Sequence, residues 1–205
     1  MPDNLITDDN SLTHPPAVRA CVGAIASPPR QPWLIYCNLD VPHSPWPRAV
    51  LSHRFSAAER EVHLSQIALE RGARGAHTSH AFDRDMSVAS GLLGAWREQP
   101  DAAIVTRQAF YAACAIADRQ VGEILSAASR HAAHALVVLW SDHGEMALEH
   151  EMMQKGSMFE ASARVVLALR GPGVAAHREP HPASIIEIYP TVLQLAEIGA
   201  SVGAH

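Results

Sequence analysis

A carboxylate and an imidazole stand side by side at Asp142 and His143, between an apolar run and Gly144. The run from Ala135 to Trp140 shows no alternation and is centred on valines, which predicts a strand buried on both faces. Residues that follow such a strand lie at the rim of a sheet, where α/β proteins place their ligands. Asp142 offers oxygen and His143 nitrogen to a divalent cation, while Gly144 allows a tight turn. Two adjacent ligands cannot hold a metal alone, and the pair could instead cap a following helix.

A lysine and a histidine elsewhere in the chain have no assigned role from composition and spacing alone. Lys155 is the only lysine in the chain, because every other basic residue is arginine. His43 lies in a proline-rich turn after an apolar segment, and an imidazole can donate a proton near neutral pH. Both also have an ordinary interpretation as solvated surface residues, since most lysines are exposed and the chain holds 13 histidines. The segment His150 to Gln154 fails the zinc-protease pattern HExxH at its last position.

Composition excludes several classes of function. The net charge of −5 gives no electrostatic support for binding nucleic acid or an anionic membrane. No apolar stretch approaches the roughly 20 residues of a membrane span, and the start of the sequence, MPDNLITDDN, lacks the pattern of a signal peptide. Cys37 and Cys114 fall in a predicted strand and a predicted helix, where buried thiols are common. Composition leaves the compartment and the oligomeric state undecided.

The expected elements alternate between helices and strands, as in an α/β protein. The clearest is a helix over 101–128, whose apolar stripe would pack on a sheet and consists of Phe110, Cys114, Ala117, Val121 and Leu125. Shorter helices are predicted over 17–25, 56–73 and 157–163, and strands over 33–39, 135–140, 165–169 and 184–188. A last helix should open at Pro190, where the missing N–H costs nothing. Residues 72–100 are predicted to form a polar loop.

Several sequence blocks, in order, resemble the sulfatase family. The fullest runs from Trp140 to Val174 and reads WSDHGEMALEHEMMQKGSMFEASARVVLALRGPGV. It is similar to the family segment in which SDHGE is followed by an EH pair, a lysine and RGPG. Blocks that agree in order are PWLIYCNLDVPHSPWP, FYAACAIADRQVGEIL and SIIEIYPTVLQLAEIG. The resemblance implies an incomplete α/β fold of the alkaline phosphatase type, with a mostly parallel sheet flanked by helices.

The resemblance also implies roles for individual residues. Asp142 and His143 match the family's late metal-ligand pair, which binds calcium together with two consecutive aspartates and a formylglycine on an earlier segment. Lys155 matches the lysine that contacts the sulfate and the leaving oxygen, where a cation would stabilise developing charge. His43 matches the histidine that hydrogen-bonds the sulfate and protonates the leaving alcohol. The implied substrate is an aryl sulfate or a sulfated sugar, and the implied location of the parent enzyme is lysosomal or secreted.

The chain also departs from the family pattern. A sulfatase nucleophile arises from C/S-x-P-x-R, but the three cysteines are followed by Val22, Asn38 and Ala115. The paired aspartates at Asp8 and Asp9 follow no apolar strand. We therefore expect residues 1–205 to form a single partial catalytic domain, the middle to late portion of a sulfatase, without its nucleophile and C-terminal subdomain. Such a chain would be aggregation-prone or partly molten, because half a sheet leaves apolar faces uncovered.

Three functions remain open at this point. The parent enzyme could be a sulfatase, and the details YC, FYAAC and KGSMFEAS are most similar to a subgroup acting on sulfated uronic acid in glycosaminoglycans. It could instead be a phosphatase, phosphodiesterase or phosphonate hydrolase of the same superfamily. The third alternative is a truncated, non-catalytic chain. Within the polar loop, the residues that could bind a uronate carboxylate are His77, His80 and Arg84.

Overall fold

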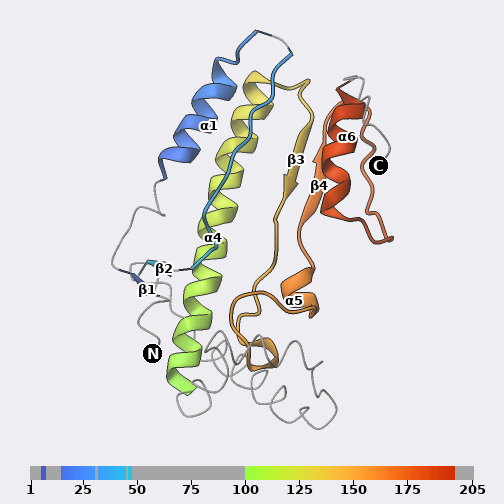
Figure 1. The fold of residues 1–205 in the computed structure, drawn as a ribbon. Coiled ribbons are helices and arrows are strands. Elements are labelled where there is room, and N and C mark those ends of the chain that lie inside the picture. Colours follow the sequence, from blue (N-terminus) through green and yellow to red (C-terminus); the bar gives the residue numbers. More distant parts are fainter. Residues whose placement is uncertain (1–5, 8–14, 31, 45, 48–99, 197–205) are drawn as a thin grey trace.

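The computed structural model describes residues 6–7, 15–30, 32–44, 46–47 and 100–196 (Figure 1). The predicted helix over 56–73, the loop over 72–100 and the uronate candidates His77, His80 and Arg84 lie outside these residues. No helix of the described part is long and apolar enough to cross a membrane.

A 32-residue helix, α4 (Pro100–His131), is the longest element of the described chain. It confirms the helix predicted over 101–128. Its fully buried positions, however, differ from the predicted stripe, whose members are only half-buried. The buried set is Ile104, Thr106, Arg107, Ala109, Ala113, Ile116, Gln120, Ala127 and Ala128. The helix thus buries more than one face, and one of its neighbours is another helix rather than the sheet.

That neighbour is α1 (Pro16–Ala26), which lies along α4 (Figure 1). Its buried side chains recur at helical spacing and consist of Val18, Cys21 and Ile25. Ile25 joins Ala127 and Ala128 in a small apolar cluster against which Ile35 and Val137 also pack. Pro16 stands in the first turn, where its fixed φ suits a helix start. The short helix predicted over 17–25 is therefore confirmed.

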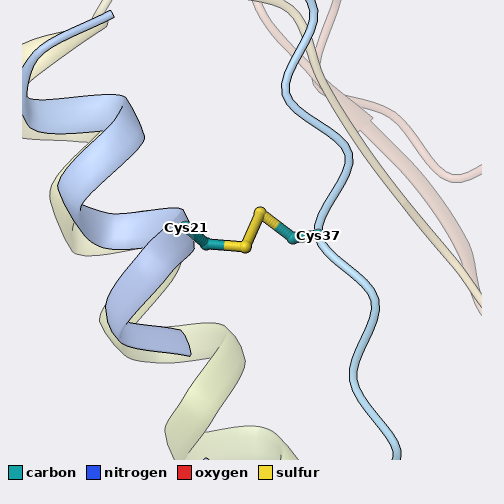
Figure 2. The surroundings of a disulfide bond; sticks show 2 residues. All are labelled: Cys21 and Cys37. Carbon is teal, nitrogen blue, oxygen red and sulfur yellow. A yellow bond between two sulfur atoms is a disulfide. The ribbon is translucent and has the colours of Figure 1, made fainter. Parts of the chain in front are cut away.

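A disulfide between Cys21 and Cys37 ties α1 to the extended segment over 33–40 (Figure 2). The two Cα atoms are 5.9 Å apart. The expectation of a buried thiol at Cys37 was therefore wrong. Cys114 is free. This segment was predicted to be a strand, but it forms no strand ladder with any described residue. Its residues nevertheless alternate between half-buried and exposed, and the Tyr36 ring lies 5.6 Å from that of Trp140.

Two strands form the described sheet beside α4, and they are antiparallel: β3 (Val137–Trp140) and β4 (Leu167–Arg170). Val137 is paired with Arg170, and Trp140 with Leu167. The predicted parallel arrangement is absent from this pair, because β4 runs back along β3 in the opposite direction. The β3 side chains are half-buried rather than buried on both faces, since the described part supplies only one strand neighbour. A two-residue parallel bridge joins β1 (Ile6–Thr7) to β2 (Trp46–Pro47). Because β1 ends directly before Asp8 and Asp9, the expectation that no strand precedes this aspartate pair was wrong.

The chain between these strands and after them forms short helical elements joined by irregular segments. The connection holds the 3₁₀ turn η4 (Glu149–Glu151) and α5 (Glu160–Ala163), the latter inside the helix predicted over 157–163. The strand predicted over 184–188 is wrong: this stretch forms η5 (Ile185–Glu187) and opens α6 (Ile188–Leu195). A capping box explains the difference, because Ser184 accepts a backbone hydrogen bond while Glu187 accepts one from the Ser184 amide. The last helix accordingly begins before Pro190.

Apolar side chains remain exposed on the described surface. The set consists of Leu34, Tyr36, Tyr111, Met158, Val166, Leu169, Val174, Ile186, Tyr189 and Leu195. They lie mainly on the extended segment, around β4 and on α6 with its preceding turn. This exposure agrees with the expected tendency to aggregate, which stays a prediction.

Candidate functional site

The loop directly after β3 presents Asp142 and His143 and is held by its own hydrogen bonds. The Ser141 hydroxyl donates to the His143 carbonyl at 2.7 Å, and the His143 amide donates to Asp142 Oδ1 at 3.0 Å. No helix begins at this loop, so the alternative in which the pair caps a helix is wrong. The strand-end placement predicted from the sequence is therefore confirmed.

Gly144 is required by space rather than by a special φ. A Cβ atom there would lie 2.0 Å from the carbonyl oxygen of Ala161. The Gly144 amide donates to the carbonyl of Ser162 at 2.8 Å, which draws the loop against α5. The missing side chain thus permits the contact that fixes the position of the preceding Asp142 and His143.

The two candidate ligands direct donor atoms toward the same region. His143 Nδ1 lies 2.9 Å from the Gly144 carbonyl, which places the ring proton on Nδ1 and leaves the Nε2 lone pair available. His143 Nε2 and Asp142 Oδ2 are 3.6 Å apart, a separation that two ligands of one cation can adopt. The Asp142 side chain is exposed and accessible to a cation.

Lys155 and His43 meet beside this pair, although 112 positions separate them in the sequence. Lys155 Nζ donates to His43 Nε2 at 2.7 Å, and His43 Nδ1 contacts the carbonyl of Ser44. The His43 and His143 rings meet edge to face with their centroids 6.3 Å apart. The structure therefore brings all four candidate residues, Asp142, His143, Lys155 and His43, into one place.

Lys155 extends from a loop whose apolar side chains are buried as in a core. Met146, Leu148, Met152 and Met153 are each at most 6% exposed. Four non-glycine residues of this loop have positive φ angles: 45° at Ala147, 75° at Leu148, 51° at His150 and 66° at Gln154. Such backbone conformations persist where the surrounding structure enforces them, and they cluster at functional sites. His150, the histidine of the failed zinc-protease pattern, stacks on Phe159 with ring centroids 3.9 Å apart.

Sequence reasoning missed Glu145, the residue that organises this loop. Glu145 Oε1 accepts hydrogen bonds from the amide of Gln154 and, at 3.3 Å, from the amide of Ala147. Burial raises the pKa of the Glu145 carboxyl, while these two backbone hydrogen bonds and the neighbouring Lys155 and His143 oppose the rise. The only sequence signal was an acidic residue directly after the Asp-His-Gly motif.

The thiol of Cys114, on α4, lies close enough to Glu145 to feel its charge. Burial, reinforced by the charge of Glu145, raises the pKa of the Cys114 thiol from 9.0 to about 11. The thiol therefore stays protonated near neutral pH and acts as a small, weakly polar packing group. It is unsuited to serve as a nucleophile.

A metal ion would find a suitable but incomplete set of donors here. Asp142 and His143 offer the hard oxygen and the imidazole nitrogen that divalent cations accept. Among the described residues, no group of three or more histidine, cysteine, aspartate or glutamate side chains could hold a metal. A bound cation would therefore need further ligands besides these two side chains.

Together, the strand end and the converging side chains gather two candidate metal ligands, an ammonium and an imidazole in one place. The sulfatase family model matches residues 16–198, and the chain belongs to the sulfatase family. The family implies an α/β fold of the alkaline phosphatase type. The described helices and two-stranded sheet are a part of such a fold.

Curated relatives agree with this assignment. Arylsulfatase K of Rattus norvegicus is 34% identical over 180 residues, which cover 82% of this chain and 31% of that protein. Arylsulfatase K of Homo sapiens is 33% identical over 180 residues, covering 82% and 33%. The protein of the same name from Danio rerio is 32% identical over 184 residues, covering 84% and 34%. The chain thus spans about a third of the length of the curated relatives it matches, and the resemblance inferred from its motifs is confirmed.

Proposed function

We propose that this chain supplies the late half of a sulfatase active site and that the parent enzyme hydrolyses sulfate esters. One observation carries the proposal: Lys155 Nζ donates to His43 Nε2 at 2.7 Å, beside the Asp142–His143 loop. A cation and a proton carrier next to two metal-ligand types suit an anionic ester that loses an alcohol. The four residues come from two segments that are distant in the sequence.

In this proposal Lys155 and His43 act on the sulfate ester directly. The ammonium of Lys155 neutralises charge that grows on the ester oxygen as its bond to sulfur breaks. With substrate bound, His43 acts as an imidazolium. Its Nδ1–H stays directed at the Ser44 carbonyl, and Nε2, which accepts from Lys155 in the absence of substrate, carries a proton taken up from water and delivers it to the leaving alcohol. An arriving sulfate would therefore replace the direct Lys155–His43 contact with two contacts of its own.

Asp142 and His143 are proposed to hold calcium, the metal that the family generally binds. Calcium would add positive charge beside the sulfate, and the nucleophile would be the family's formylglycine on a segment this sequence does not match. Asp142 is exposed, and His143 keeps its Nε2 lone pair because Nδ1 is turned to the Gly144 carbonyl. We expect the chain alone to bind calcium weakly and to show no turnover, because two ligands and no C/S-x-P-x-R motif are present.

The finer substrate assignment rests on the similarity to arylsulfatase K. We propose an aryl sulfate or a sulfated sugar, with a uronic acid of a glycosaminoglycan as the natural candidate. A lysosomal or secreted location fits the Cys21–Cys37 disulfide, because such bonds persist in oxidising compartments.

A graft tests the proposal on this chain's own residues. Residues 16–198 would replace the matching segment of rat arylsulfatase K, and the folded graft would be assayed on an aryl sulfate and an aryl phosphate side by side. We expect hydrolysis of the sulfate to be preferred. Preference for the phosphate would favour the phosphatase or phosphodiesterase alternative. A folded graft that carries the formylglycine yet hydrolyses neither ester would favour the non-catalytic alternative.

A further inference from the structure

Gln154, the residue directly before Lys155, is held through both its backbone amide and its backbone carbonyl by the strand-end loop. The Gln154 amide donates to Glu145 Oε1, and the Gln154 carbonyl accepts from the Met146 amide at 2.7 Å. Gln154 itself has a φ of 66°, a conformation that an L-residue rarely adopts without support. Gly156, with a φ of 94°, turns the chain again directly after Lys155. The direction of the Lys155 side chain therefore depends on how firmly Gln154 is held.

Glu145 is in turn anchored at its own backbone. The preceding Gly144 packs against the Ala161 carbonyl and donates to Ser162 at 2.8 Å. The following Met146 is fully buried, and its sulfur accepts a hydrogen bond from Ser157 at 3.3 Å. A side chain that leaves such a fixed backbone can hold another segment in place, because few rotations remain to be frozen.

Burying a carboxylate in this loop costs free energy, which its hydrogen bonds must offset. Removing a carboxyl group from water disfavours its charged form, and apolar residues surround the loop. The two backbone amides from Gln154 and Ala147 compensate by donating to the same oxygen. Neither amide belongs to a regular helix or strand, so Glu145 substitutes for the hydrogen-bond partner that regular structure would provide.

We propose that Glu145 is a positioning residue that holds the Gln154 amide and thereby aims Lys155 at His43. The consequence of this role for sulfate binding rests on the proposed function, because the assignment of Lys155 as the sulfate contact belongs to that proposal. The positioning of Lys155 by Glu145 does not depend on it. The essential property is the acceptor oxygen at the end of a side chain of this length. Glutamine keeps that oxygen, whereas methionine keeps the length and volume but offers no comparable acceptor.

Two measurements on the full chain report the two ends of this arrangement without any sulfatase assay. Hydrogen exchange of the Gln154 amide, followed by NMR, reports the hydrogen bond itself. The second is the rate at which an amine-acylating reagent modifies Lys155. Because Lys155 is the only lysine, the amino terminus is the one other reactive amine and serves as an internal reference. A Lys155 released from His43 should be modified faster.

The variants Glu145→Gln and Glu145→Met separate the acceptor from the volume of the side chain. Glu145→Gln should leave both readouts within about twofold of wild type, whereas Glu145→Met should speed Gln154 exchange by about tenfold, the equivalent of one hydrogen bond. Acylation of Lys155 should rise in Glu145→Met as well. The control is Glu160→Gln, which removes an exposed carboxylate that pairs with Arg164 at 3.3 Å and should change neither readout.

The proposal is overturned if Glu145→Gln exchanges as fast as Glu145→Met, or if Lys155 acylation is equal in every variant. Should Glu145→Met fail to fold, the Glu145→Gln measurement alone decides, because fast exchange in that variant contradicts the acceptor role. Since neither readout requires turnover, an inactive graft would refute the proposed function and leave these outcomes untouched.

Discussion

Removing the Cys21–Cys37 disulfide should release α1 and the extended segment from each other. The bond joins positions 16 residues apart. Closing a loop of that size restricts the opened chain by about 3 kcal/mol in the chain-entropy treatment. Since 1.4 kcal/mol corresponds to a factor of ten, α1 should open on the order of a hundred times more often without the bond. The perturbation is the double variant Cys21→Ser and Cys37→Ser.

Hydrogen exchange of the α1 amides measures this opening locally and does not require the whole chain to unfold in one step. We expect protection of Val22 and Ile25, which belong to the apolar cluster against α4, to fall by about two orders of magnitude. Amides of α4 near Cys114 should change far less. Cys114→Ser is the matched control, because it replaces a free cysteine of the same chain.

A thiol count provides an independent check of the bond. The denatured, unreduced chain should expose one reactive thiol, that of Cys114, and the reduced chain should expose all three cysteines. The reasoning is refuted if three thiols react before reduction. It is also refuted if α1 protection in the double variant stays within about twofold of the Cys114→Ser control.

Three further predictions concern packing, ionisation and exposed surface. Gly144→Ala should lower the free energy of unfolding by about 1–3 kcal/mol, because its Cβ would meet the Ala161 carbonyl, whereas Gly122→Ala, with nothing within 4 Å, should raise it by about 0.5–1 kcal/mol. Urea denaturation compares the two, and equal effects would contradict the close approach at Gly144. The Cys114 thiol binds its proton more tightly when folded, so its contribution to stability should fall as the pH rises from 9.0 to about 11. Cys114→Ala should lose less stability than wild type over that range, and an identical loss would contradict the burial of the thiol. At raised concentration the isolated chain should bind a hydrophobic dye and self-associate through its exposed apolar side chains, whereas the dilute chain used for the unfolding measurements stays folded; a monomeric sizing profile at every concentration would count against this.

The sequence predicted the elements that periodicity alone determines. The apolar spacing along α4 is a local signal, and both α4 and α1 form where expected. The strand over 33–39 does not form among the described residues because a strand needs a hydrogen-bonding neighbour, and an apolar run does not say whether one is present. The strand predicted from Ser184 was wrong for a different reason. Its apolar run suggested a strand, but the Ser184–Glu187 capping box favours a helix start.

The candidate site was predicted in part, and the missing part was non-local. Asp142 and His143 could be recognised from the strand end, whereas Lys155 and His43 needed the family resemblance because 112 positions separate them. Glu145 was missed since its partners are backbone amides, which leave no pattern in side-chain sequence. The Cys21–Cys37 pairing was equally hidden, because three cysteines do not reveal which two are joined.

The central claim is that Lys155, held against His43, is the sulfate-binding cation of this chain. The most direct measurement is kcat for an aryl sulfate in the graft that carries residues 16–198, with and without Lys155→Met. We predict a fall of about 10²–10³-fold, as expected when one charge-stabilising donor is removed. The control Arg164→Met removes an exposed cation that pairs with Glu160 and should leave kcat nearly unchanged. A Lys155→Met graft that keeps the kcat of its parent would contradict the account.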